Sequence, residues 1–332
     1  MRRCSILLLL FAACISPSMV ERRVMLMGTS LDIAVEATDR AAGLAASERA
    51  VEALEAAEAR LSTWRSDTEL ARLNHVPVGE RQTLSPALAS DLTAALHCAR
   101  ETDGAFNPAV GSLVRAWGLR EGGRLPDPEQ RSAAMADSRF EDLDLEAGAA
   151  VRRRPGLILE EGGFGKGAGL GEAIAALSIL GIPRASLDLG GQVAVLGKGW
   201  LVPVADPRHR DRPAVALSID GGSVSTSGNS ERGIEVAGRK LGHILDPRTG
   251  EPVPDFGSLT VWAADPLRAD CLSTGLYVLG PERALAWAAA HPDVEVLVLR
   301  PEGDRLRALA SPGLKGKIRT LSPEVEIEFG GS

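Results

Sequence analysis

Apolar and polar residues alternate along much of the chain, which is the pattern of half-buried strands. From Val24 to Val35 the alternation is interrupted at Gly28, so we predict one strand with a point of close backbone approach there. Similar runs predict further strands, several of them consecutive and joined by short turns. Their ranges are 185–197 with a bend at Gly190-Gly191, 200–207, 214–220, 223–228, 233–238, 240–247, 258–266, 294–301 and 305–310.

Other stretches place leucine, valine and alanine at helical spacing and carry helix start and stop signals. Ser85 as N-cap and Pro86 in the first turn open one helix, which Gly104 closes. The segment 156–181 predicts a strand, a glycine turn and a helix that begins at about Gly169. Because helices are mixed with consecutive strands, we predict an α+β fold rather than a doubly wound parallel sheet. Further helices are predicted within 40–64, 107–118, 127–137, 267–280 and 281–292.

The composition is that of a globular protein packed with aliphatic side chains. Of the 332 residues, 45% are hydrophobic and only 4% aromatic, so leucine, valine and alanine must fill the core. The net charge of −7 and the lack of a long basic run argue against nucleic acid as a partner. Lysine is scarce beside arginine, so a lysine inside a glycine turn stands out.

The N-terminus has the features of an export signal. An arginine pair precedes a short apolar run and small residues before Cys14, and the run is shorter than the ~20 residues that span a bilayer. We predict a signal peptide over 1–18, a single domain over 22–320 and a tail over 321–332. The residues before Cys14 resemble a bacterial lipoprotein cleavage box. Three interpretations stay open: a periplasmic protein, a lipoprotein facing the periplasm whose lipid is its one membrane contact, or a buried N-terminal strand.

Only two cysteines, Cys98 and Cys271, lie outside this leader. Two lone cysteines in separate helical segments do not make a disulfide framework. We therefore expect both to be buried packing residues.

A glycine-rich turn at 162–167 contains Lys166. Glycine lets backbone groups approach a ligand closely, the following helix directs its positive end at the same space, and lysine adds a compact charge. These features favour an anion such as a phosphate. The turn matches neither the Walker A nor the dinucleotide-binding pattern, so a purely structural role is the alternative.

Two pairs of polar residues could act beside that turn. Asp270 and Thr274 are four residues apart on a predicted helix, so they share a face and offer the hard oxygen ligands that Mg²⁺ prefers. The alternative is that Asp270 caps the helix and Thr274 packs against a carbonyl. Thr226 and Ser227 lie at a turn where their hydroxyls could meet phosphate oxygens.

His243 is one of five histidines and lies on a predicted strand, before an Asp-Pro turn. Its side chain should share a face with Leu241 and Leu245. A buried, fully hydrogen-bonded core histidine is the alternative to a catalytic base. Magnesium, a lysine, hydroxyls and one base together point to phosphoryl transfer or to cleavage of a phosphoanhydride.

Eight motifs occur in one order over residues 25–299: MGT, LSTWRSDTELARLN, DGAFNPAVGSLVRAWG, GGFGKG, LDLGGQVAVLG, STSGNSERG, HILDPRTGEPV and ADCLSTGLYVLG. Together they resemble the ApbE family, the FAD:protein FMN transferases. The resemblance implies an α+β fold of the T-fold type, with mixed, mostly antiparallel sheets and flanking helices. It implies exported bacterial proteins, often lipoproteins, that bind FAD and Mg²⁺, move FMN onto a threonine of an acceptor protein and release AMP.

In such proteins the acceptor is typically a membrane-bound electron-transfer subunit. Two alternatives remain: hydrolysis of FAD to FMN and AMP, and an exported protein that binds FAD without turnover. By position, the resemblance makes His243 the base, with Asp270 assisting through the metal, and Gly163, Asp270 and Thr274 the magnesium ligands. The residues that would contact FAD are Met27, Trp64, Ala105, Phe106, Asn107, Glu160 and Lys166.

The chain departs from the family's usual motifs at a few positions. Asn107 and Ala109 stand where an aspartate and a threonine are usual, Glu160 replaces an aspartate, and Asp188 replaces an asparagine. These changes bear on affinity and substrate choice more than on reaction type.

Overall fold

The computed structural model describes residues 18–332 apart from 147, 230–232, 237 and 331–332. Its main feature is a nine-stranded sheet in the order β1-β2-β6-β7-β10-β15-β16-β17-β19. Neighbouring strands run antiparallel except β17 and β19, which are parallel. The strands are β1 (Ser18–Leu26), β2 (Thr29–Ala37), β6 (Arg184–Leu189), β7 (Gln192–Leu196), β10 (Gly222–Gly228), β15 (Ser258–Ala263), β16 (Val294–Glu302), β17 (Arg305–Ala310) and β19 (Val325–Phe329).

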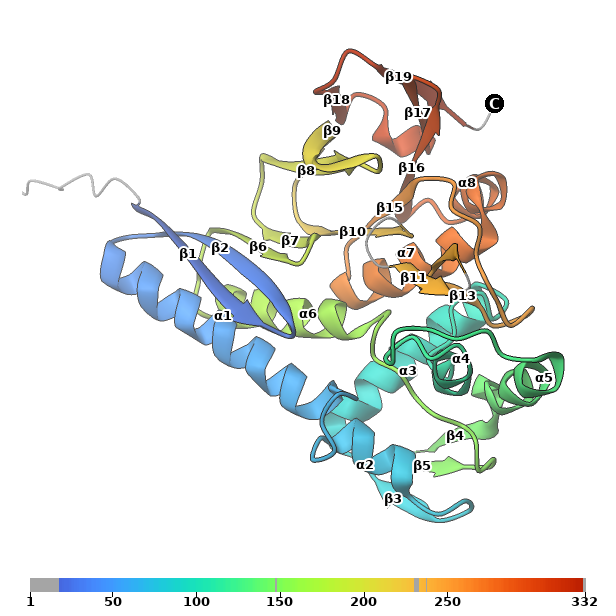
Figure 1. Cartoon of the computed structure of the whole chain (residues 1–332). Helices are drawn as coiled ribbons and strands as arrows, with labels where there is room; N and C mark the ends of the chain where they lie inside the picture. Colours follow the sequence, from blue (N-terminus) through green and yellow to red (C-terminus); the bar gives the residue numbers. More distant parts are fainter. Residues whose placement is uncertain (1–17, 147, 230–232, 237, 331–332) are drawn as a thin grey trace, which may run out of the picture.

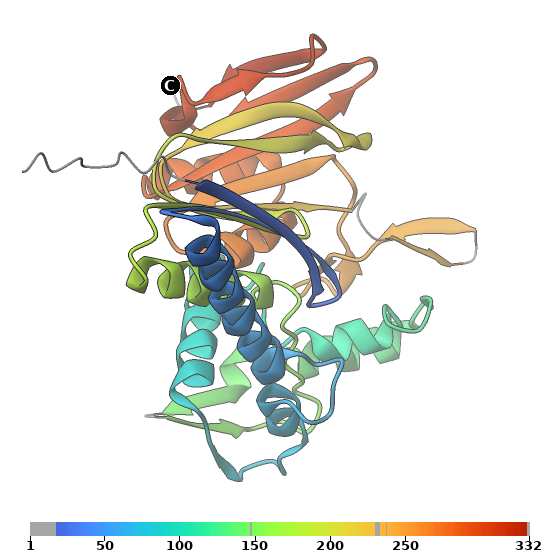
Figure 2. The same cartoon turned by 90° about the vertical axis from the view of Figure 1, so that its left-hand side faces the viewer.

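Smaller sheets surround the main one. One contains β8 (Trp200–Asp206), β9 (His209–Ile219) and β18 (Ile318–Thr320), and another β3 (Arg81–Thr83), β4 (Leu143–Glu146) and β5 (Ala149–Arg152). Two are hairpins, β11 (Gly233–Val236) with β12 (Arg239–Gly242) and β13 (Leu245–Asp246) with β14 (Glu251–Pro252). The β11–β12 hairpin extends away from the body of the molecule (Figure 2).

The helices flank the sheets, so the predicted α+β class is confirmed (Figure 1). Within the described ranges, no helix is both long and apolar enough to cross a bilayer. The helices are α1 (Arg40–Leu61), α2 (Glu69–His75), α3 (Pro86–Glu101), α4 (Gly111–Ala116), α5 (Pro128–Asp137), α6 (Gly165–Ile179), α7 (Pro266–Leu279) and α8 (Pro281–Ala290), with 3₁₀ turns at Phe140–Asp142 and Pro312–Leu314.

Each face of the main sheet has its own core. Leucines, valines and alanines of α1 and α6 pack on β2, β6 and β7, and those of α7 and α8 pack on β15 and β16. On the opposite face, valines and leucines of β7, β16 and β17 pack against β8 and β9. The predicted dominance of aliphatic packing is confirmed, because leucine, valine and alanine make up most of the buried residues.

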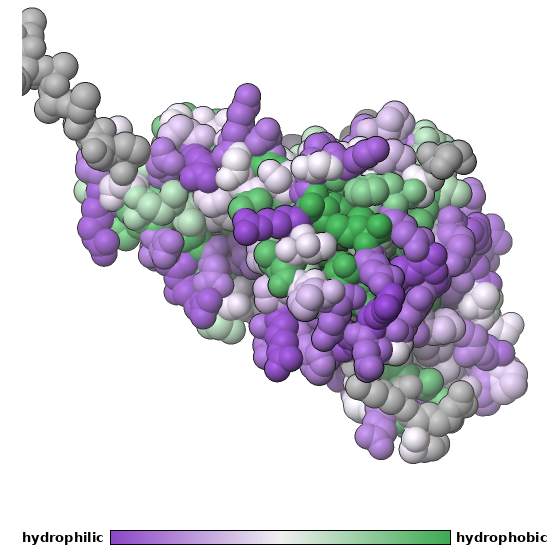
Figure 3. All heavy atoms as spheres, turned by 90° about the horizontal axis from the view of Figure 1, so that it is seen from above, coloured by the Kyte–Doolittle hydropathy of each residue, from purple (hydrophilic) through white to green (hydrophobic). Residues whose placement is uncertain are grey.

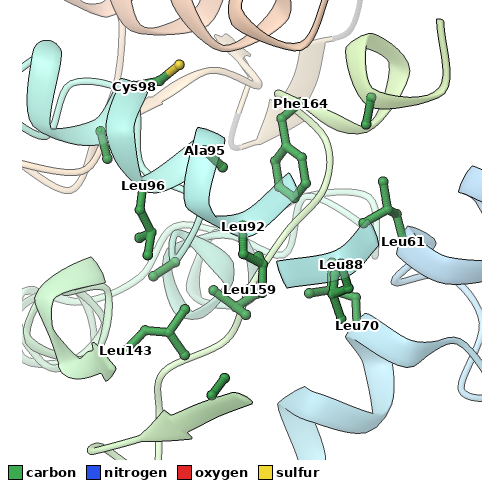
Figure 4. Close-up of a cluster of buried hydrophobic side chains, with 14 of the residues drawn as sticks. Leu61, Leu70, Leu88, Leu92, Ala95, Leu96, Cys98, Leu143, Leu159 and Phe164 are labelled. Carbon is green, nitrogen blue, oxygen red and sulfur yellow. The ribbon is translucent and has the colours of Figure 1, made fainter. Parts of the chain in front are cut away.

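A further core joins α3 to the segment before α6 (Figure 4). Leu88, Leu92 and Phe164 belong to it, and Ser85 caps α3 by accepting a hydrogen bond from the Leu88 backbone, as predicted. Cys98 and Cys271 are buried free thiols in the same cluster, which confirms that they are packing residues. Burial raises the pKa of the Cys271 thiol well above its usual value, so the thiol is inert.

Three sequence predictions need correction. The single strand over Val24–Val35 is the hairpin β1–β2, which turns at Met27 and Gly28 with φ of 49° and 72°. Such positive angles at both turn residues match the twist of a two-residue hairpin, so Gly28 allows a turn rather than a close contact. The strand expected after Gly156 is reduced to one bridge between Ile158 and Val110.

The third correction concerns the C-terminal segment. Residues 321–332 were expected as a tail, but β19 within it pairs with β17. Ion pairs Arg305–Glu326 and Arg307–Glu328 join the two strands and leave a charged edge, which discourages pairing with another chain. Seen from above, this side of the molecule shows mainly hydrophilic residues around a hydrophobic strip (Figure 3). At the other end β1 begins at Ser18, so the predicted signal peptide and Cys14 fall almost wholly outside the described residues.

Candidate active site

Asp270 lies on α7, facing the start of α6. Asp265 caps α7 by accepting a hydrogen bond from the Arg268 backbone, so Asp270 does not have the alternative role of helix cap. Asp270 is buried, with 3% of its surface exposed, and its carboxylate accepts a hydrogen bond of 2.9 Å from the Gly167 backbone. A Cβ on Gly167 would lie 2.3 Å from the Pro266 carbonyl oxygen, so glycine is needed for α6 to approach α7 this closely.

A row of buried hydroxyls connects Asp270 to the main sheet. Ser225 and Ser227 alternate on β10, and their Oγ atoms lie 3.1 and 3.0 Å from the Ser273 Oγ. Ser273 donates to the Asp270 carbonyl at 2.9 Å, and the Ser225 Oγ is 3.5 Å from the Asp270 carboxylate. Ser225 and Ser273 were not among the predicted site residues, although the two-residue spacing of Ser225 and Ser227 on a strand was a usable signal.

Thr226 does not face this row. Its hydroxyl lies 2.8 Å from that of Thr260, its partner on β15, whereas Ser225 and Ser227 face α7. Successive side chains of a strand point to opposite faces of the sheet. The prediction that Thr226 and Ser227 open into one pocket is therefore wrong for Thr226.

The three predicted magnesium ligands are gathered at the same place. Thr274 follows Asp270 by one helical turn, and its Oγ1 is 3.3 Å from where a Cβ on Gly163 would lie. The donor set is thus a carboxylate, a hydroxyl and a main-chain carbonyl. In the described part of the chain, no cluster of three or more His, Cys, Asp or Glu side chains could hold a metal. One carboxylate with neutral oxygens suits Mg²⁺, which commonly takes its remaining ligands from substrate phosphates and water.

Lys166 lies in the first turn of α6, which begins at Gly165, four residues before the predicted start. Met27 packs on this turn. Its Sδ would lie 3.6 Å from a Cβ added to Gly169, and its Cε would lie 4.0 Å from a Cβ added to Gly165. Lys166 also acts electrostatically on Asp188 of β6. Burial raises the pKa of Asp188, and the Lys166 ammonium opposes that rise. Lys166 therefore places a cation near the N-terminus of α6, where anions are favoured.

Glu160 and Trp64 belong to one cluster held together by Arg120, for which no sequence motif provided a signal. Arg120 forms an ion pair with Glu160, and its guanidinium lies 4.2 Å from the centroid of the Trp64 ring. Burial raises the pKa of the Glu160 carboxyl, while Arg120 opposes this effect and Glu161 adds to it. The cluster presents an exposed indole beside a partly buried, arginine-paired carboxylate.

The segment 105–107 lies beneath Gly163 and is mostly core. Ala105 and Phe106 are buried, and the Phe106 ring would be 3.0 Å from a Cβ on Gly163. Asn107 donates to the Ser138 carbonyl at 2.7 Å and accepts from the Ala109 backbone at 2.8 Å. The Asn107 amide thus fixes its own loop, and its predicted contact with FAD stays a prediction.

His243 lies in a bend between β12 and β13, half-exposed, rather than inside one strand as predicted. The next residue is tied to the end of β10, because Asn229 Oδ1 accepts a hydrogen bond of 3.4 Å from the Ile244 backbone. Asn229 Nδ2 donates to the Val253 carbonyl at 2.7 Å. A Cβ on Gly242 would lie 2.2 Å from the Asn229 amide. Glycine at this position therefore allows the bend that contains His243 to pack directly against Asn229.

The strand β10 thereby supports both halves of the site. Ser225 and Ser227 connect it to Asp270 and Ser273, and Asn229, just past its end, holds the bend that contains His243. A buried carboxylate with oxygen ligands, a lysine at a helix N-terminus and an accessible imidazole can bind a phosphate-bearing substrate and accept a proton.

Known proteins resemble the chain over most of its length. The ApbE family profile matches residues 27–298. A FAD:protein FMN transferase of Treponema pallidum is 30% identical over 331 aligned residues, covering 92% of this chain and 91% of that protein. The apo crystal structure of the Pseudomonas stutzeri flavinyl transferase ApbE superposes with a TM-score of 0.80 at 26% identity, covering 91% and 97% of the two chains. The flavin transferase ApbE of Vibrio cholerae gives a TM-score of 0.79 at 26% identity, covering 91% and 100%.

Proposed function

This chain belongs to the ApbE family and is a FAD:protein FMN transferase, and we propose that it transfers FMN from FAD to a threonine hydroxyl of an acceptor protein, with Mg²⁺ as cofactor and AMP as product. The observation that carries the proposal is the convergence of Asp270, Thr274 and Gly163 beside the N-terminus of α6. That arrangement suits a substrate with a diphosphate, since oxygen ligands, helix amides and the Lys166 ammonium all favour phosphate oxygens.

In the proposed reaction, His243 accepts the proton of the acceptor threonine. The threonine oxygen forms a bond to the FMN phosphorus while the bond from that phosphorus to the bridging oxygen breaks, and AMP leaves with the electron pair. Lys166 binds phosphate oxygens and Trp64 orients a flat ring of FAD. Asp270, Thr274 and the Gly163 carbonyl would hold Mg²⁺, which when bound neutralises the charge of the diphosphate.

We also propose where the reaction takes place and on what. The predicted leader in residues 1–18 supports an exported enzyme, with or without a lipid at Cys14. The acceptor would then be a protein domain exposed on the same side of the membrane, such as that of a membrane-bound electron-transfer subunit.

The test is incubation with FAD, Mg²⁺ and an acceptor domain, followed by a denaturing gel viewed for flavin fluorescence. A fluorescent acceptor band that is lost with EDTA and with His243→Ala is the expected result. Release of free FMN and AMP without a band would instead indicate hydrolysis. FAD retention without either product would indicate a binding protein.

A further inference from the structure

Trp64 is the most exposed tryptophan of the candidate site, with 67% of its surface accessible. It lies in the short loop after α1, and the guanidinium of Arg120 lies over its ring, 4.2 Å from the centroid. A large aromatic side chain left open to solvent beside a candidate phosphate site is suited to stack on a planar ligand.

Arg120 is held in place by several groups. Its Nη1 donates to the Thr63 carbonyl at 3.0 Å, and its Nη2 donates to the Thr63 hydroxyl at 2.5 Å and to the Glu160 carboxylate. The Thr63 hydroxyl also bonds to Glu160 at 3.1 Å. Because the guanidinium is planar and fixed on two sides, the orientation of the ring stacked on it is restricted as well.

We propose that Arg120 is a positioning residue for FAD: it holds the exposed Trp64 indole so that the ring face opposite Arg120 stacks on a flat ring of the substrate. The inference rests on the proposed function, in which FAD is the substrate. Isoalloxazine and adenine are both planar and aromatic, so stacking alone does not distinguish them. Arg120 is not a catalytic residue, because it acts through Trp64 and Glu160.

The chain contains a matched control for this arrangement. Arg184 of β6 stacks on Trp200 of β8 with its guanidinium 4.0 Å from the ring centroid, and it donates to the Lys198 carbonyl at 3.0 Å. This second arginine–tryptophan pair lies between β6 and β8 rather than beside α1. Arg184→Gln therefore removes the same kind of contact without touching the candidate site.

The experiment measures binding of FAD, FMN and AMP to the full chain by calorimetry. Arg120→Gln should weaken FAD binding about 3- to 10-fold, the range expected when a cation–π contact that orders an aromatic platform is lost. If Arg120→Gln weakens the binding of FMN but not of AMP, Trp64 stacks on the isoalloxazine. If it weakens the binding of AMP but not of FMN, Trp64 stacks on the adenine. Arg184→Gln should leave all three affinities unchanged.

A double-mutant cycle separates positioning from a general structural effect. In a Trp64→Ala background, Arg120→Gln should have little further effect on FAD affinity, because the platform is already absent. The KM for FAD should rise in Arg120→Gln while kcat at saturating FAD changes little. Arg120→Lys keeps a charge beside Glu160 and serves as the variant of choice if Arg120→Gln unfolds.

Unchanged FAD affinity in folded Arg120 variants would overturn the inference. An equal loss of FAD affinity in Arg184→Gln would do the same. So would a double-mutant cycle in which the effects of Trp64→Ala and Arg120→Gln on FAD binding are fully additive. These outcomes are independent of the reaction itself. If FMN transfer fails but substitution of Arg120 weakens FAD binding, the proposed function is overturned and the inference stands. If transfer is normal but substitution of Arg120 leaves FAD binding unchanged, only the inference is overturned.

Discussion

Asp270 combines a structural hydrogen bond with a proposed role as metal ligand, and the two can be separated by substitution. Its carboxylate accepts from the buried Gly167 amide, which an asparagine can also do. Asp270→Asn should fold normally yet reduce transfer by about 100-fold or more, because the proposed metal ligand loses its negative charge. Asp270→Ala should also lose about 1–3 kcal/mol of unfolding free energy, since the Gly167 N–H is left without its acceptor.

Thermal unfolding and a transfer assay on both variants check this prediction. Equal stability of the two variants would show that the Gly167 hydrogen bond contributes little. Full transfer activity in Asp270→Asn would remove Asp270 from the proposed metal site.

Asp188 offers a test of electrostatics that depends on pH. Burial raises its pKa, Asp32 adds to the rise, and the Gly191 backbone, Lys166 and Arg23 oppose it. A carboxyl whose folded pKa is raised binds its proton more tightly in the folded state, so the protein loses stability as pH rises from ~3.9 through the folded pKa. Asp188→Asn keeps the acceptor for Gly191 and removes the partly buried charge.

The Asp188→Asn variant should therefore be more stable than the original protein at pH 8, with the difference shrinking toward pH 4. Melting temperatures across that range provide the measurement. A variant that is less stable at pH 8 would mean that attraction to Lys166 outweighs the desolvation of Asp188.

At the scale of elements, the contact between α6 and α7 sets the position of Asp270. A Cβ on Gly167 would lie 2.3 Å from the Pro266 carbonyl, whereas one on Gly171, a turn later on the same helix, would meet nothing closer than 3.9 Å. Gly167→Ala should cost about 1–3 kcal/mol and lower activity by displacing α7. Gly171→Ala should stabilise the protein by about 0.5–1 kcal/mol, as expected for alanine in a helix.

Chemical denaturation of the two alanine variants provides the comparison. If both variants change stability by the same amount and in the same direction, the close helix approach does not control the site.

The bend between β12 and β13 depends on Asn229 in a comparable way. Asn229→Ala removes the acceptor of the Ile244 amide and the donor to the Val253 carbonyl, so about 1–3 kcal/mol of stability should be lost. Because His243 precedes Ile244, kcat should fall more than FAD affinity does. Steady-state kinetics and calorimetry on the variant provide the measurement. An unchanged kcat would show that Asn229 does not position His243 for the reaction.

Prediction from the sequence was most accurate where a local signal specified the structure. Ser85 and Pro86 marked the start of α3, and the helical spacing of Asp270 and Thr274 placed both on one face of α7. It failed where a distant contact decided the outcome. Gly28 forms a hairpin turn because β1 and β2 pair, and Thr226 faces away because β10 pairs with β15.

Arg120 illustrates what sequence alone could not provide. It lies 56 positions from Trp64 and 40 from Glu160 in the numbering, and no spacing rule connects the three residues. Only the packing of the loop after α1 against the segment after α4 brings them together.

At the scale of the whole molecule, the nine-stranded sheet is packed against α6 and α7, the two helices that contribute to the candidate active site. The strand β10 lies in the middle of this sheet and contacts α7, and Asn229 just past its end contacts the His243 bend, so the proposed metal ligands and the proposed base are held by the same strand. A rigid support of this kind is expected for an enzyme that positions a diphosphate and an incoming hydroxyl together.

The most direct test of the account is mass spectrometry of an acceptor domain after incubation with the enzyme, FAD and Mg²⁺. We predict a mass increase equal to FMN less one water, located on a threonine, with one AMP released for each adduct. His243→Ala and Asp270→Asn should abolish the adduct, while Arg184→Gln should leave it unchanged. An unmodified threonine in several acceptor domains, despite bound FAD and metal, would contradict the central claim.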